Sequence, residues 1–464
     1  MDYKVNIGLE VHIELLTKHK MFCMCKNNFG DIPNKNICPI CTGLPGSLPV
    51  PNRDAIYLAV KAGLATNCII DKKIIFDRKN YFYKDLPKGY QITQFFNPIC
   101  RNGYISLSNK NINIKEIHME EDAGKSKNNI IDYNRAGVPL LELVTMPDFE
   151  NEEEVIEFLN ILKEILVFCN ISDCKIQEGS MRVDINLSVR KENEPMGNRV
   201  EIKNVGSFKS IRNAIKYEIK RHIELLESGK TINTETRKFD ENSNKTVFMR
   251  NKESINDYCY FKDPDITPIN LSNDFIKNIA KTIPTLPQEK RKIYKNLYNL
   301  SIDDINIVLY NPKINSLFEE LVNKTNKPKE VVNLISSELF KILNEKNLNI
   351  DTLNFNTNYI SSLINIFLDN KISRDTYKKV FLEIIVNNIN PINFIKENNL
   401  YLIEDTKFIE DTIINIINEN TKSVLDYKSG KEKALKYLIG QCMKAFKGKC
   451  DIKLIEKLLL KHIT

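Results

Sequence analysis

The stretch from Ile117 to Val144 reads IHMEEDAGKSKNNIIDYNRAGVPLLELV and sets concentrated charge between apolar, strand-like segments. Three acids stand in a row, Glu120, Glu121 and Asp122, and a fourth carboxylate, Glu142, is isolated inside the apolar run LLELV. Burying an unpaired carboxylate costs several kcal/mol unless a cation or a hydrogen-bond donor meets it. The stretch therefore indicates a site for a metal ion and phosphate, built on strands.

Three further segments alternate between apolar and polar residues, which is typical of strands with one buried face. They are residues 5–15, 181–189 and 199–203. A solvent-exposed outer face would explain any one of them. Three charged faces together predict one charged floor, which carries Glu10, His12, Glu14, Arg182, Asp184, Asn186, Glu201 and Lys203.

Segments with the apolar spacing of helices lie between and after these strands in the sequence. Residues 152–169 and 208–228 each carry an apolar stripe with the period of an amphipathic helix. After residues 284–294 strand-like alternation largely disappears and helical patterns take over. The sequence predicts an α+β fold: an N-terminal, mixed but largely antiparallel sheet domain flanked by helices (1–293), an all-α domain (294–406) and a small helical tail domain (407–464).

Composition bounds the class of protein. A chain of 464 residues is too long for one ordinary core, so two or three domains are expected. No apolar run approaches the roughly 20 residues that span a bilayer, and the N-terminus lacks the features of a signal peptide. We expect a cytoplasmic protein without a membrane segment.

Four of the eleven cysteines cluster within residues 22–42, as Cys23, Cys25, Cys38 and Cys41. Two thiolate pairs separated by a short, turn-rich loop can close a tetrahedral zinc site, and four sulfur ligands leave no position for water. The alternative is a loop with free cysteines. The pattern favours a structural zinc, since a disulfide framework is not expected without a secretory signal.

The net charge of +7 is concentrated at the C-terminus. Residues 421–464 hold eleven lysines and four acids, so the preceding 420 residues balance to zero. A solvated helix face is the ordinary explanation of such a segment, and phosphate binding is the alternative. The candidate phosphate contacts are Lys431, Lys433, Lys436, Lys444, Lys447 and Lys449.

Several catalytic motifs are excluded. The Gly124-Lys125 pair does not belong to a P-loop, because the first glycine of that motif would fall at Met119. There is no G-x-S-x-G elbow and no cysteine with a recognisable histidine partner. Residues 76–94 mix aromatics with bases such as Lys79, which could stack on a base and meet phosphate, or simply form an amphipathic loop. Carboxylates with a histidine for Mg2+, lysines for phosphate and a basic tail together suit ATP-dependent activation of something attached to nucleic acid.

Many long motifs resemble the B subunit of the glutamyl/aspartyl-tRNA amidotransferase. The similarity runs in order along the chain and includes the stretches IGLEVHIEL (7–15), CPICTGLPGSLPVPN (38–52), FDRKNYFYKDLPKGYQITQ (76–94), MEEDAGK (119–125), DYNRAGVPLLELV (132–144), EGSMRVDINLSVR (178–190), EIKNVGSF (201–208), ETRKFD (235–240), MRNKES (249–254), DYCYFKDPDITP (257–268) and GQCMKAFKGK (440–449).

This resemblance implies an activity that corrects Glu on tRNA(Gln), or Asp on tRNA(Asn), to the amide. In this family the B subunit binds the tRNA and phosphorylates the side-chain carboxylate with ATP and Mg2+. A separate amidase subunit releases ammonia from glutamine, and a small third subunit fastens the two into a heterotrimer. The missing nucleophile and the missing glutaminase motif agree with this division of labour. Whether one or both tRNAs are substrates stays open.

The resemblance also implies roles for residues of the charged floor. Glu10, His12 and Glu121 are expected to hold Mg2+, with Glu120 binding through water or bracing the strand, and Lys79 is expected to meet ATP phosphates. A break in alternation near Lys115 predicts a β-bulge, after which Glu120 and Glu121 face opposite ways. The remaining expected contacts to nucleotide, metal or aminoacyl end are Glu142, Arg182, Asp184, Asn186, Glu201 and Lys203.

Two expectations concern other parts of the chain. The tail lysines would grip the body of the tRNA. The zinc motif varies within the family, so its expected role here is to brace the loop near the site. Two rival hypotheses remain: a catalytically inert RNA-binding scaffold, and a stand-alone ATP-dependent amide ligase that acts on a small molecule.

Overall fold

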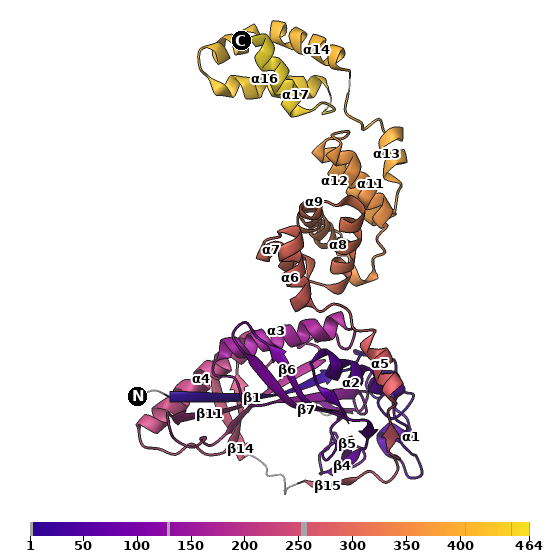
Figure 1. The fold of residues 1–464 in the computed structure, drawn as a ribbon, viewed down its shortest axis with the longest axis vertical. Coiled ribbons are helices and arrows are strands. Elements are labelled where there is room, and N and C mark those ends of the chain that lie inside the picture. The colour runs from indigo at the N-terminus through magenta and orange to yellow at the C-terminus, as the bar shows by residue number, and fades with distance from the viewer. Residues whose placement is uncertain (1–2, 128–129, 252–257, 404, 447, 464) are drawn as a thin grey trace. The chain divides into compact units, whose positions relative to one another are not determined.

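Alternating apolar residues at the N-terminus form β1 (Tyr3–Glu14), the fifth strand of a nine-stranded sheet in the computed structural model of the chain (Figure 1). The structure describes residues 3–127, 130–251, 258–403, 405–446 and 448–463. The chain divides into two compact units, Met1–Lys290 and Arg291–Thr464. Each unit is considered by itself.

The large sheet of the first unit has the strand order β14-β13-β12-β11-β1-β10-β7-β6-β2. Its neighbouring strands are antiparallel except for the parallel pair β12 and β13. The other strands of this sheet are β2 (Ile69–Ile70), β6 (Cys100–Ser106), β7 (Asn111–Glu121), β10 (Pro139–Thr145), β11 (Met181–Lys191), β12 (Val200–Lys203), β13 (Glu235–Asp240) and β14 (Lys245–Asn251).

Three smaller sheets accompany the large one. A three-stranded sheet has the order β15-β4-β5, and two strand pairs complete the set. These strands are β3 (Lys73–Ile74), β4 (Asp77–Asn80), β5 (Tyr90–Thr93), β8 (Lys125–Lys127), β9 (Ile130–Asp132), β15 (Cys259–Lys262) and β16 (Ile269–Asn270). The helices of the unit are α1 (Pro39–Thr42), α2 (Arg53–Ala65), α3 (Glu152–Phe168), α4 (Phe208–Glu227) and α5 (Asn273–Ala280).

One face of the large sheet is buried under helices. The apolar residues of β1, such as Leu9 and Val11, share a core with Phe158 and Leu162 of α3 and with Ile211 of α4. Figure 1 shows α3 and α4 lying along this side of the sheet. Burying every second side chain leaves the alternate residues of each strand on the opposite face, where the charged floor lies.

The predicted bulge in β7 is present. Val144 of β10 pairs with Glu116, but the next residue, Thr145, pairs with Ile114, so Lys115 is the extra residue of β7. Its effect is the predicted one, because Glu120 and Glu121 lie on opposite faces of the strand: Glu120 lies next to His12 of β1, and Glu121 lies next to Lys88.

The second unit is helical over its described residues. Ile409, Leu438, Cys442 and Leu459 belong to one buried apolar cluster near the C-terminus. The helices are α6 (Pro287–Tyr298), which begins before the unit boundary, α7 (Ile302–Val308), α8 (Pro312–Thr325), α9 (Pro328–Asn333), η2 (Leu334–Leu339), α10 (Phe340–Glu345), η3 (Ile350–Thr352), α11 (Thr357–Leu368), α12 (Arg374–Asn387), α13 (Pro391–Glu397), α14 (Thr406–Glu419), α15 (Thr421–Lys428), α16 (Glu432–Ala445) and α17 (Ile452–Ile463).

The predicted fold class is confirmed: a mixed, largely antiparallel sheet with helices precedes a helical C-terminal region. The domain boundaries at 293/294 and 406/407 stay predictions. Among the described residues, no helix combines the length and the apolar character needed to cross a membrane.

Candidate functional site

The strand register brings the predicted polar faces onto one floor. His12 of β1 pairs with Glu142 of β10 on one side and with Arg182 of β11 on the other. In the adjacent row, Glu10 pairs with Asp184 of β11. Side chains directly opposite one another in an antiparallel sheet lie close enough to interact. Segments far apart in the sequence therefore contribute to one charged surface.

A cavity of about 640 Å³ opens over this floor. Of the predicted site residues, the cavity is lined by His12, Lys79, Glu120, Glu142, Arg182, Asp184 and Lys203. Lining residues that were not among the predicted site residues include Tyr81, Gln91, Asp122, Lys125, Glu178 and Asn204. Glu10, Asn186 and Glu201 belong to the same floor but do not line the cavity.

His12, Glu120 and Glu142 form a group whose ligand atoms all lie within 4.8 Å of one another. The Nε2 atom of His12 lies 3.6 Å from Glu120 and 3.9 Å from Glu142. Burial, and then the nearby charge of Glu142, raise the pKa of Glu120 to about 7. Burial would also raise the pKa of Glu142, but His12 and His118 hold it below its usual range. Two carboxylates and an imidazole in this arrangement can hold a divalent cation.

The raised pKa of Glu120 predicts pH-dependent cation binding, because a cation competes with the proton. We expect the affinity for Mn2+ to rise about fivefold between pH 6 and pH 7 and to level off above about pH 8. Isothermal titration calorimetry measures this directly. Without metal, the charged form of buried Glu120 costs stability that grows as pH rises from about 4.5 to about 7. Glu120→Gln should abolish both trends, and an unchanged pH profile in that variant would contradict the assignment.

Glu10, Asp184 and Glu201 form a second group with ligand atoms within 4.8 Å of one another. Here cations and donors are already supplied by the protein: Lys203 Nζ lies 2.6 Å from Asp184 and 3.5 Å from Glu201, and Asn186 donates to Glu10 over 2.9 Å. Burial would lower the pKa of Lys203, but Asp184 and Glu201 raise it. The second group is therefore the poorer cation site, since its charge is partly neutralised.

Glu121 is not brought together with Glu10 and His12. It faces the opposite side of β7, where its carboxylate accepts hydrogen bonds from the ammonium of Lys88 and from the backbone N–H of Ile92. The expected set of Glu10, His12 and Glu121 thus does not form one cluster. Adjacent strand residues point to opposite faces, so Glu120, and not Glu121, shares the floor with His12.

A chain of ion pairs not anticipated from the sequence includes two residues that line the cavity, Asp122 and Arg182. Asp122 accepts from Arg135 and lies 3.0 Å from Nη2 of Arg182. Arg135 also donates to the carbonyl of Gly179 over 2.8 Å. Burial would raise the pKa of Asp122, but Arg182 and Arg135 hold it below its usual range. The sequence signal for this pair was Arg135 in the motif DYNRAG (132–137). An arginine close to the run of acids Glu120 to Asp122 is expected to pair with one of them.

Lys79 lies on β4 among aromatic rings. Its Nζ is 4.7 Å from the centre of the Tyr258 ring and 5.5 Å from that of Tyr81. Phe95 stacks on Tyr260 at 4.0 Å in the same region. The mixture of aromatics and bases in residues 76–94 is thus partly a structured wall of the cavity, with a cation held by cation–π contacts.

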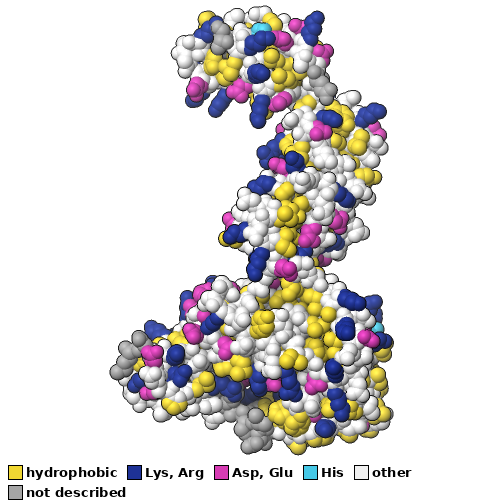
Figure 2. All heavy atoms as spheres, viewed as in Figure 1, with side chains coloured by type: hydrophobic (Ala, Val, Ile, Leu, Met, Phe, Trp, Pro, Cys, Tyr) yellow, Lys and Arg dark blue, Asp and Glu magenta, His cyan; other side chains and the backbone are white. Residues whose placement is uncertain are grey.

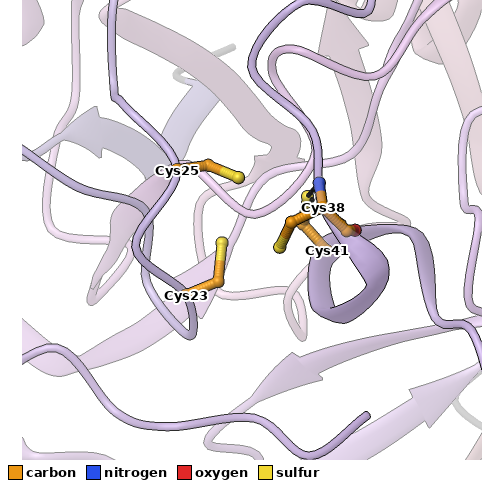
Figure 3. Close-up of side chains that lie close together, drawn as sticks. All are labelled: Cys23, Cys25, Cys38 and Cys41. Carbon is orange, nitrogen blue, oxygen red and sulfur yellow. Dashed lines mark hydrogen bonds between the residues drawn. The ribbon is translucent and has the colours of Figure 1, made fainter.

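The four clustered cysteines converge in the structure (Figure 3). Their sulfur atoms all lie within 4.8 Å of one another, and none of them forms a disulfide. The backbone N–H of Cys38 donates to the sulfur of Cys41 over 3.2 Å. A hydrogen bond from Cys23, and further the ammonium of Lys20, hold the pKa of Cys41 below its usual range. This donor set fits a tetrahedral metal such as zinc.

Several predicted tail lysines share one helix face. Lys433, Lys436 and Lys444 of α16 are exposed and fall within about one third of the helix circumference. Lys431 is exposed and pairs with Asp426 over 2.8 Å. Lys449 is half-buried, and Lys447 lies outside the described residues. Figure 2 shows lysine and arginine side chains on the surface of the C-terminal helices.

Comparison with known proteins places the chain in a family. Residues 5–277 match the GatB/GatE catalytic domain, and residues 316–463 match the GatB domain. Proteins described as the B subunit of aspartyl/glutamyl-tRNA(Asn/Gln) amidotransferase are similar over nearly their whole length. The protein of Lachnoclostridium phytofermentans is 45% identical (98% of both chains), that of Caldicellulosiruptor saccharolyticus 45% (100% and 99%) and that of Clostridium kluyveri 43% (100% and 99%). The chain therefore belongs to the family of aspartyl/glutamyl-tRNA(Asn/Gln) amidotransferase B subunits.

Proposed function

We propose that this chain is the tRNA-binding, ATP-dependent kinase subunit of a glutamine-dependent amidotransferase. The observation that carries the proposal is the acidic cavity floor, in which His12, Glu120 and Glu142 form a cation site beside Lys79 and Arg182. The substrates would be Glu-tRNA(Gln), Asp-tRNA(Asn) or both. The family membership supports an amidation that depends on tRNA.

The chemistry explains why such a floor is useful. A carboxylate is a poor electrophile, because attack by ammonia would have to expel oxide. A side-chain carboxylate oxygen therefore attacks the γ-phosphorus of ATP, and ADP leaves. Ammonia then attacks the acyl carbon, phosphate leaves, and one proton is lost to give the amide. The protein has to hold two anions against each other and neutralise them.

The residues divide this work as follows. His12, Glu120 and Glu142 would hold Mg2+, which when bound neutralises the charge of the phosphates. Lys79 would meet the ATP phosphates. Its Nζ lies over the ring of Tyr258, and its positive charge acts on the nearby carboxylates of Glu120 and Glu142. Arg182, which lines the cavity, would orient the aminoacyl end. Glu10, Asn186, Glu201 and Lys203 would support the floor from the neighbouring row.

The remaining parts of the proposal concern the assembly. A separate amidase subunit would supply ammonia from glutamine, and a small third subunit would complete a cytoplasmic heterotrimer. The lysines of α16 would contact tRNA phosphates away from the acceptor end. Zinc would bind at the four cysteines and stabilise the loop between them.

A reconstituted three-subunit complex tests this function. We expect Gln-tRNA(Gln) or Asn-tRNA(Asn) to form only when ATP, glutamine and the misacylated tRNA are all present, and ATP turnover to depend on that tRNA. An inert scaffold predicts no ATP turnover by a complex that contains this chain. A small-molecule ligase predicts amidation of the free amino acid, with activity intact after deletion of residues 407–464. Either result would contradict the proposal.

A further inference from the structure

Lys20 is a buried cation beside the four cysteines. Its side chain is fully buried, with 0% relative exposure. The Nζ atom lies 3.7 Å from the sulfur of Cys41 and donates to the backbone carbonyl of Tyr133 over 3.1 Å. Within the described parts of the chain, Lys20 forms no salt bridge with a carboxylate. A buried ammonium is costly without a negative partner, so the cysteine cluster is the natural counter-charge.

The chemistry of a zinc site supplies that negative charge. Four thiolates around Zn2+ leave a net charge of −2, and such clusters are stabilised by nearby donors and cations that do not themselves bind the metal. The backbone N–H of Cys38 already donates to Cys41. Lys20 adds a full positive charge to the same sulfur, from outside the tetrahedron.

The second contact of Lys20 leads toward the cavity. Tyr133 belongs to the segment that carries Arg135, which pairs with Asp122, which in turn pairs with Arg182 in the cavity wall. The loop between the two cysteine pairs is bound to the same segment by five hydrogen bonds, which join residues 32–36 to residues 131–134. The cysteine cluster and the cavity wall are thus connected through one short stretch of chain.

We propose that Lys20 is a positioning residue that neutralises a zinc-bound tetracysteine cluster and fastens it to residues 131–135 behind the cavity. This inference rests on the zinc site of the proposed function and goes beyond it. Bound zinc then keeps the segment that holds Arg135 ordered, and the contact of Lys20 with the Tyr133 carbonyl contributes part of this ordering.

The rate of zinc release from the full-length chain tests whether the positive charge of Lys20 stabilises the zinc-bound cysteine cluster. The variants are Lys20→Met, which removes the charge, Lys20→Arg, which keeps it, and the control Lys18→Met, which removes an exposed lysine two residues earlier. We expect Lys20→Met to release zinc to a chromogenic chelator about 10- to 100-fold faster than the wild type. Lys20→Arg, which keeps the charge, should release zinc at nearly the wild-type rate, and Lys18→Met should release it at the wild-type rate.

Hydrogen exchange tests the connection without any substitution. Removing zinc from the wild-type chain should speed amide exchange in residues 131–137 and leave residues 409–417 of α14 unchanged. Equal release rates for Lys20→Met and Lys18→Met, or unchanged exchange in residues 131–137, would overturn the inference. A wild-type chain that fails to retain one zinc would overturn it together with the zinc site, whereas the kinase proposal would be untouched because its assay follows amide formation.

Discussion

Replacing Glu142 with glutamine is expected to lower tRNA-dependent ATP turnover and amide formation at least about a thousandfold. Glu142 lies between two histidines, and its pKa is held below the usual range, so its carboxylate is charged at neutral pH. Glutamine keeps the shape and removes the charge. Because a metal ion supplies several kcal/mol of transition-state stabilisation, loss of a charged ligand should act on kcat.

Metal affinity and tRNA binding show whether this loss has the proposed cause. Glu142→Gln should weaken Mn2+ binding measured by calorimetry at least about tenfold, while the Kd for tRNA stays unchanged. Glu121→Gln is the informative comparison, since Glu121 faces Lys88 on the other side of β7. It should leave Mn2+ affinity unchanged, whatever it does to activity. If Glu121→Gln abolishes metal binding and Glu142→Gln does not, the cation site is misplaced.

The floor could be predicted from the sequence because strand alternation is a local signal. The pattern of residues 5–15 fixes which side of β1 is polar, since apolar alternates such as Leu9 lie in the core that β1 shares with α3 and α4. The same reasoning, with the bulge at Lys115, places Glu120 and Glu121 on opposite faces of β7 from the sequence alone. Alternation alone does not determine whether Glu120 or Glu121 lies on the same face of the sheet as the polar residues of β1.

That choice depends on register across strands. The expected ligand set joined Glu121 to His12, whereas the pairing of β7 with β10 and of β10 with β1 puts Glu120 there instead. Contacts between loops are harder still to predict, because no periodicity relates Asp122 to Arg182 or Lys20 to Cys41. These pairs depend on loop geometry, which carries a weaker sequence signal than strands or helices.

Reversing the charge of Lys433, Lys436 and Lys444 together is expected to raise the Kd for tRNA by about a hundredfold at moderate salt. The three lysines lie on one exposed face of α16, around Gly440, where the helix surface leaves open space. Each lysine that neutralises a phosphate releases counterions, so the slope of log Kd against log salt should fall by two to three units, roughly. Amide formation at saturating tRNA should keep its kcat, since no chemistry is assigned to this helix.

A matched control separates local contact from overall charge. Lys327, Lys341 and Lys346 are exposed lysines elsewhere in the second unit, and their replacement by glutamate changes the net charge by the same amount. If this control variant weakens tRNA binding as much as the α16 variant does, the tail acts only through long-range attraction and grips no phosphate. A loss in the α16 variant alone, measured by filter binding across a salt series, locates the tRNA contact on α16, because only contacting lysines release counterions stoichiometrically.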